Sequence, residues 1–91
     1  MSRGGSTATD YLTRIRQPIT LSPSPAQNVI FIESQEEILQ YSITDLQGKM
    51  WMSERGTGQL STPSIQSLPS GMYSVCVQTN LGIGIGRFVK L

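Results

Sequence analysis

The residues most suggestive of chemistry are three glycines at alternate positions, Gly82, Gly84 and Gly86, in the stretch NLGIGIGRFVKL. Glycine-rich loops bind phosphate where they follow a strand and open a helix, whose N-terminus holds the anion. Here the residues after Gly86 alternate as they do in a strand, and no helical pattern follows. We therefore predict strand glycines, lying close to a bulky neighbour such as Tyr73 or Trp51, and no phosphate site.

Other catalytic chemistry lacks its usual side chains. The sequence has no histidine, the residue used for proton transfer near neutral pH, for most metal sites and for serine catalysis. Its one cysteine, Cys76, is predicted to be a buried or half-buried strand residue, with an intermolecular disulfide as the alternative. The net charge is +1, and no window concentrates basic residues, which argues against a nucleic-acid partner. We predict no enzyme, with no catalytic residue, no metal ligand and no cofactor.

The rest of the sequence consists of short strand-like runs separated by turn residues. Alternation is clearest in MYSVCVQT, where Tyr73, Val75 and Val77 fall on one face. We predict an all-β fold over residues 18–91, an immunoglobulin-like antiparallel β-sandwich of about seven strands. The small polar residues of RGGSTATD indicate that residues 1–17 are a linker or a flexible N-terminal remnant. The clearest predicted strands are residues 28–34, 38–45, 49–53, 72–79 and 83–91, with a short strand near Ile65, a turn at SQEE and a loop at ERGTG.

Three residues at the ends of these strands or between them have predicted roles in turns. Gly48 and Gly71 stand where the backbone needs a positive φ, a conformation that glycine adopts without strain. Asp45 is expected to cap the hairpin turn by accepting hydrogen bonds from backbone N–H groups. These positions are therefore needed by the fold itself.

Four motifs follow one another along the chain, namely SPSPA, DLQGK, LPSGMY and GRFVKL. We expect the ring of Tyr73 to be buried beside Trp51 or Phe88. In this order the motifs resemble the type A C-terminal sorting domain of the type IX secretion system (the Por secretion system family), over about residues 21–91. Ser24 departs from the family's Pro-Asn-Pro-Ala pattern. The residues that match the family's motifs are Pro23, Pro25, Ala26, Asp45, Leu46, Gly48, Lys49, Leu68, Pro69, Gly71, Tyr73, Arg87, Phe88 and Lys90.

The resemblance implies a signal domain that directs its parent protein through the periplasm and across the outer membrane, to the cell surface or into the medium. It implies recognition by the translocon and by a sortase complex, which commonly attaches an anionic lipopolysaccharide to the cargo. One alternative is a retained docking domain that passes this anchor to the sortase, and another is an adhesive or carbohydrate-binding sandwich. The residues expected to form the signal are Pro23, Pro25, Asp45, Gly48, Lys49, Gly71, Tyr73, Arg87, Phe88, Val89, Lys90 and Leu91.

Two surfaces are expected to meet other proteins. The last strand carries Arg87 and Lys90 and is followed by the carboxylate of Leu91, so we expect an edge strand whose backbone and two cations are recognised by β-addition. Val29 and Phe31 alternate with Ile30 and Ile32, so one apolar pair is expected to face outward, where it could support a homodimer.

Overall fold

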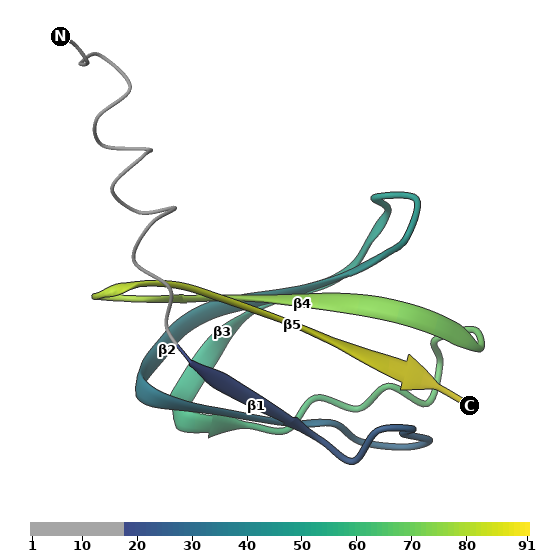
Figure 1. Cartoon of the computed structure of the whole chain (residues 1–91), viewed down its shortest axis with the longest axis horizontal. Helices are drawn as coiled ribbons and strands as arrows, with labels where there is room; N and C mark the ends of the chain where they lie inside the picture. The colour runs from purple at the N-terminus through teal and green to yellow at the C-terminus, as the bar shows by residue number, and fades with distance from the viewer. Residues whose placement is uncertain (1–17) are drawn as a thin grey trace, which may run out of the picture.

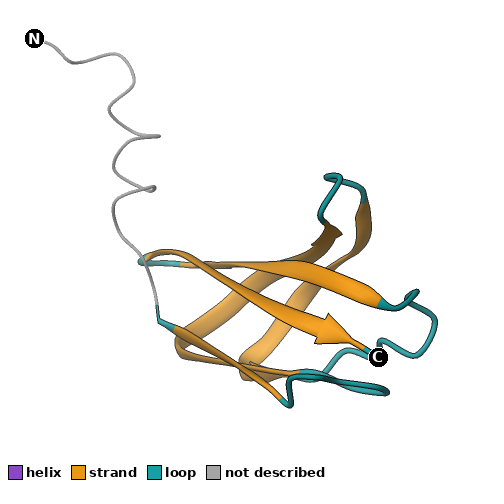
Figure 2. Cartoon of the chain, turned by 45° about the vertical axis from the view of Figure 1, so that its right-hand side comes forward, coloured by secondary structure: helices purple, strands orange, loops and turns teal. Residues whose placement is uncertain are grey.

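The computed structural model describes residues 18–91, which form a β-structure with no helix in that part of the chain (Figures 1 and 2). Residues 1–17, the predicted linker, lie outside the described residues. No helix within residues 18–91 is long and apolar enough to cross a membrane. The strands are β1 (Ile19–Ser22), β2 (Phe31–Asp45), β3 (Met50–Ser61), β4 (Gly71–Thr79) and β5 (Gly82–Lys90).

The five strands belong to one antiparallel sheet in which the hydrogen-bonded order is β1-β2-β4-β5. The remaining strand, β3, also pairs with β2. The first part of β2 pairs with β1, and residues 40–45 pair with β4. The hairpin of β2 and β3 is long enough to take part in both halves of the sheet, which folds over itself (Figure 1). As a result β1 and β5, the two ends of the hydrogen-bonded path, lie against each other.

The all-β antiparallel class is confirmed, but the predicted number of strands was wrong, because the described residues contain five strands and not about seven. SQEE is no turn: β2 continues through it, and register shifts between Glu33 and Gln40 let the strand bend while it stays paired with β3. ERGTG likewise continues β3. The expected strand near Ile65 is reduced to an isolated bridge between Val29 and Ser64. The two-sheet immunoglobulin-like sandwich stays a prediction.

The core forms where the inner faces of the folded sheet meet. Tyr73, Val75 and Val77 are buried, as their alternation predicts. Cys76 was expected to be at least half-buried and is exposed, because the same alternation places it on the outer face of β4. The other apolar core residues are Ala26, Ile30, Ile32, Ile38, Tyr41, Ile43, Ile65, Leu68 and Phe88.

Gly86 of β5 is explained by a close neighbour, although not by the predicted one. β5 runs through Gly84 and Gly86 as a strand, as expected. A Cβ on Gly86 would lie 2.9 Å from Cδ1 of Leu21 and 3.4 Å from Cδ1 of Ile19, both on β1. Gly86 therefore lets β1 approach β5, and neither Tyr73 nor Trp51 covers it.

The apolar alternation at the start of β2 is also confirmed. Ile30 and Ile32 are buried, whereas Phe31 is 44% exposed. Val29 is half-buried. The homodimer that this outward pair could support stays a prediction.

Candidate recognition surface

The four sequence motifs meet at one end of the molecule, at the right of Figure 1. The register of the strands brings them together: Asp45 is paired with Tyr73, and Tyr73 with Phe88. Ala26, which follows Pro25, forms a parallel bridge with Lys90. Segments that lie far apart in the sequence thus share one surface, which we call the motif end. It comprises residues 23–26, 45–51, 68–73 and 87–91.

The hairpin turn at the motif end is organised by the carboxylate of Asp45. Its Oδ1 accepts hydrogen bonds from the backbone N–H groups of Gln47 (2.9 Å) and Lys49 (3.0 Å), which confirms the predicted cap. Its Oδ2 accepts a hydrogen bond from Nε1 of Trp51 at 3.0 Å. The ammonium of Lys49 lies 4.1 Å from the centre of the Trp51 ring, a cation–π contact. Gly48 has a φ of +89°, as predicted.

These contacts favour the ionised form of Asp45. The hydrogen bond from Trp51 is the main cause that lowers the pKa of Asp45 below its ordinary value of 3.8, and the backbone N–H groups and the charge of Lys49 act in the same direction. A carboxyl group whose pKa is lower in the folded chain than in the unfolded chain stabilises the fold at pH values above its pKa in the unfolded chain. That contribution disappears as the pH falls through the folded pKa.

We therefore expect Asp45→Asn to lower the melting temperature at neutral pH and to flatten its decline in acid. Between about pH 5 and pH 2 the wild-type melting temperature should fall towards that of the variant, because protonation removes the same charge. Thermal unfolding followed by Trp51 fluorescence or circular dichroism measures both curves. A constant difference between the two curves across this range would contradict the role given to the ionised carboxylate.

The turn that precedes β4 joins the motif end through Tyr73. Gly71 has a φ of +150°, which confirms the predicted need for glycine. The Tyr73 hydroxyl donates a hydrogen bond to the carbonyl oxygen of Pro69. Its ring stacks on Phe88, with 5.6 Å between centroids and 20° between planes. Tyr73 and Phe88 are both buried, so these two motif residues act from inside the fold.

The end of β5 differs from the exposed, doubly charged edge that the sequence suggested. The N–H of Ala26 donates to the carbonyl oxygen of Val89 (2.8 Å), and the N–H of Leu91 donates to the carbonyl oxygen of Ala26 (2.9 Å). Lys90 is only 9% exposed, and its Nζ donates to the carbonyl oxygen of Leu91. The expectation of two accessible cations on a free terminal edge was therefore wrong, because Lys90 points inward and Ala26 closes the edge at Val89 and Leu91. Arg87 is exposed.

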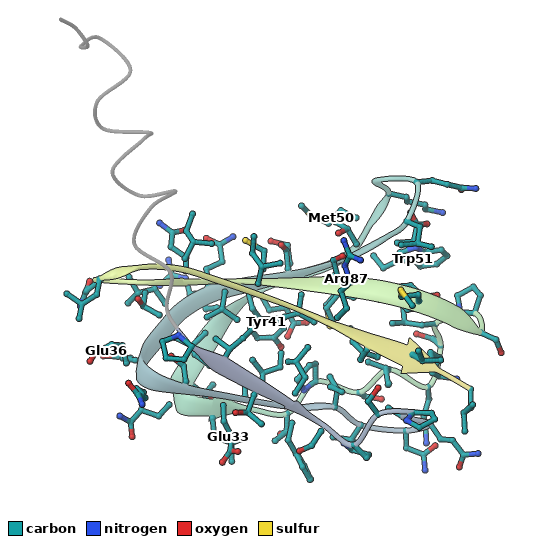
Figure 3. All side chains as sticks on the ribbon, in the orientation of Figure 1. Glu33, Glu36, Tyr41, Met50, Trp51 and Arg87 are labelled. Carbon is teal, nitrogen blue, oxygen red and sulfur yellow. The ribbon has the colours of Figure 1, made fainter. Side chains whose placement is uncertain are left out.

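A shallow cleft of about 260 Å³ opens between the two turns at the motif end. Its rim carries exposed apolar side chains, Leu46 (68% exposed) and Met72 (40% exposed). Figure 3 places Met50, Trp51 and Arg87 on the same side of the molecule, far from Glu36 at the opposite end. The residues that line the cleft are Asp45, Leu46, Gln47, Trp51, Pro69, Ser70, Gly71, Met72 and Tyr73.

The predicted signal residues divide by exposure. Asp45 and Val89 are half-buried, and three others are buried, namely Tyr73, Phe88 and Lys90. The prediction omitted Trp51 and Met72, which line the cleft. A signal for Trp51 was present, because its N–H requires an acceptor and Asp45 stands at the other end of the same short hairpin. The exposed predicted residues are Pro23, Pro25, Gly48, Lys49, Gly71, Arg87 and Leu91.

The family model described as "Secretion system C-terminal sorting domain" matches residues 20–90. No curated protein matches the chain.

Proposed function

Since the chain belongs to the secretion system C-terminal sorting domain family, we propose that the motif end is the surface through which the translocon and the sortase complex recognise it. The family identifies the domain as a C-terminal sorting signal of type IX secretion, which implies export to the cell surface or secretion. Recognition of a folded surface needs exposed groups held in fixed positions. The motif end supplies both requirements.

The observation that carries this proposal is the convergence of four motifs, distant in sequence, on one end of the fold. Inside that end, Tyr73 and Phe88 hold the β4–β5 hairpin in place. Outside it, Leu46 and Lys49 are exposed on the turn that Asp45 organises. Apolar side chains beside a cation are typical of the centre and rim of a protein interface.

Export of a fluorescent reporter fused ahead of the domain tests the proposal. We expect the double variant Leu46→Ser, Lys49→Ser to reduce surface or secreted reporter by about tenfold, the effect of losing about 1.4 kcal/mol of binding free energy at the interface. The matched control removes an exposed leucine and an exposed cation from β3, in Leu60→Ser, Arg55→Ser. Equal export of the two variants, with both domains shown to be folded by circular dichroism, would refute recognition at the motif end.

The proposal includes transit through the periplasm and a later step at the sortase, which transfers the cargo to anionic lipopolysaccharide. A cleaved signal and a retained docking domain differ in the mature protein. Mass spectrometry of the surface protein separates them, because a cleaved signal leaves no peptide from β5, whereas a retained domain yields one.

A further inference from the structure

β5 presents unpaired backbone groups along part of its length. Its pairing with β4 extends from Gly82 to Lys90 without a register shift. On its other side, Ala26 bonds to Val89 and Leu91. Because N–H and C=O groups in an antiparallel strand alternate in direction, those of Ile83, Ile85 and Arg87 point to the same side as those of Val89. Within residues 18–91, no strand pairs with β5 over Ile83–Arg87 on that side.

β1 lies next to this edge without occupying it. Its hydrogen bonds go to β2. Its side chains Ile19 and Leu21 reach Gly86, which stands on the inner face of β5. The chain then leaves β1, and Ala26 pairs with β5 only at its end. The edge from Ile83 to Arg87 therefore continues a ladder that Ala26 has already begun, and unpaired edges of this kind accept added strands.

The outward side chains of β5 are apolar, with one cation, and those of the neighbouring strands on this face are mostly uncharged polar groups. On β5, Ile83 and Ile85 face outward, and Ile85 is 52% exposed. Arg87 follows on the same face. None of the side chains that the register places on this face of the β2, β4 and β5 segments is acidic. These side chains are Gln40, Ser42, Thr44, Met72, Ser74, Cys76, Gln78, Ile83, Ile85, Arg87 and Val89.

We propose that the Ile83–Arg87 edge binds an extended segment of a partner protein. In that segment every second side chain faces outward, and three successive outward side chains are two apolar ones and one acidic one. In such a segment the two apolar side chains lie beside Ile83 and Ile85, and the carboxylate lies beside Arg87. This inference rests on the proposed recognition function and extends the recognised surface from Arg87, at the motif end, along β5 to Ile83.

The charge of Arg87 favours a foreign strand over a second copy of this chain. If two copies paired antiparallel through β5 about Ile85, Arg87 of each would face Ile83 of the other. Both guanidinium groups would then remain without a carboxylate. An acidic side chain in a strand from another protein would supply the missing carboxylate. Charge complementarity therefore favours a foreign strand over a second copy of this chain.

The test uses the full chain and short capped peptides in which two isoleucines and one glutamate alternate with threonines, written in both strand directions. We expect amide NMR shifts centred on Ile83, Ile85 and Arg87, and slower hydrogen exchange there. Lysine in place of the glutamate should weaken binding about fivefold at low salt, since exposed ion pairs have modest energies. A peptide N-methylated along its pairing edge should not bind.

Charge reversal provides the decisive comparison. Arg87→Glu should invert the preference, so that the lysine peptide binds more tightly, while Arg55→Glu on β3 should leave the preference unchanged. Shifts centred elsewhere, or equal binding of both peptides, would overturn the proposal. A concentration-dependent dimer with shifts at the same residues and no peptide present would overturn it too, and would identify a second copy as the occupant. None of these results depends on the export assay, so the two proposals fail separately.

Discussion

Gly56→Ala is expected to destabilise the domain by at least about 3 kcal/mol, the upper range for steric overpacking. The added Cβ would lie 1.9 Å from the carbonyl oxygen of Ile38 and 2.5 Å from its carbonyl carbon. Both atoms belong to the backbone of β2, so no side-chain rotation relieves the contact. The pairing of β2 with β3 at the bend would have to open. A domain of this size is stabilised by about 5 to 13 kcal/mol, so a large fraction of that stability is lost.

Urea unfolding followed by Trp51 fluorescence measures this loss, and Gly58→Ala is the control. Gly58 has a φ of +94° and no atom within 4 Å of an added Cβ, so its alanine variant suffers backbone strain without a clash. We expect about 1 kcal/mol for that strain. If the two variants unfold at the same urea concentration, the close approach of β3 to Ile38 is not what the fold requires at this position.

Phe88→Ala is expected to cost about 3 to 5 kcal/mol, the range for deleting a buried aromatic ring. Phe88 is among the largest fully buried side chains and stacks on Tyr73. The variant leaves a cavity in the core beside Tyr73, and it removes an aromatic pair worth about 1 kcal/mol beyond its buried area. Phe88→Leu, which keeps most of the apolar volume, should lose less than half as much.

Thermal unfolding of the two Phe88 variants checks this expectation, and similar melting temperatures for wild type and Phe88→Ala would contradict the burial of the ring. The result also bears on export. Removing the last four residues, FVKL, takes away Phe88 and the two hydrogen bonds between Ala26 and the end of β5. Loss of export after that truncation would follow from unfolding alone, so point variants at exposed residues are the sharper test of a signal.

Local features of the fold were predictable because they depend on neighbours in sequence. The alternation of Tyr73, Val75 and Val77 places them in the core, and the turns at Gly48 and Gly71 have the positive φ that their surroundings demand. Asp45 caps its turn through backbone groups two and four residues away. Each of these outcomes follows from the period of a strand or from the geometry of one turn.

Features that join distant segments were not predictable in the same way. SQEE and ERGTG have the composition of turns, yet β2 and β3 continue through them, because each strand supports the other at the bend beside Gly56. Composition describes one segment at a time. It does not show whether a facing strand will keep a polar run in the sheet.

The amino-acid sequence by itself determined the all-β class, the turns and the four motifs, because these depend on side-chain period, backbone freedom and order along the chain. Only the tertiary structure decided that Leu21 covers Gly86, that Lys90 is buried while Arg87 is exposed, and that Ala26 closes the end of β5. The physical reason is that burial and edge pairing are set by segments far away in the chain, whose approach is fixed by packing of the whole sheet.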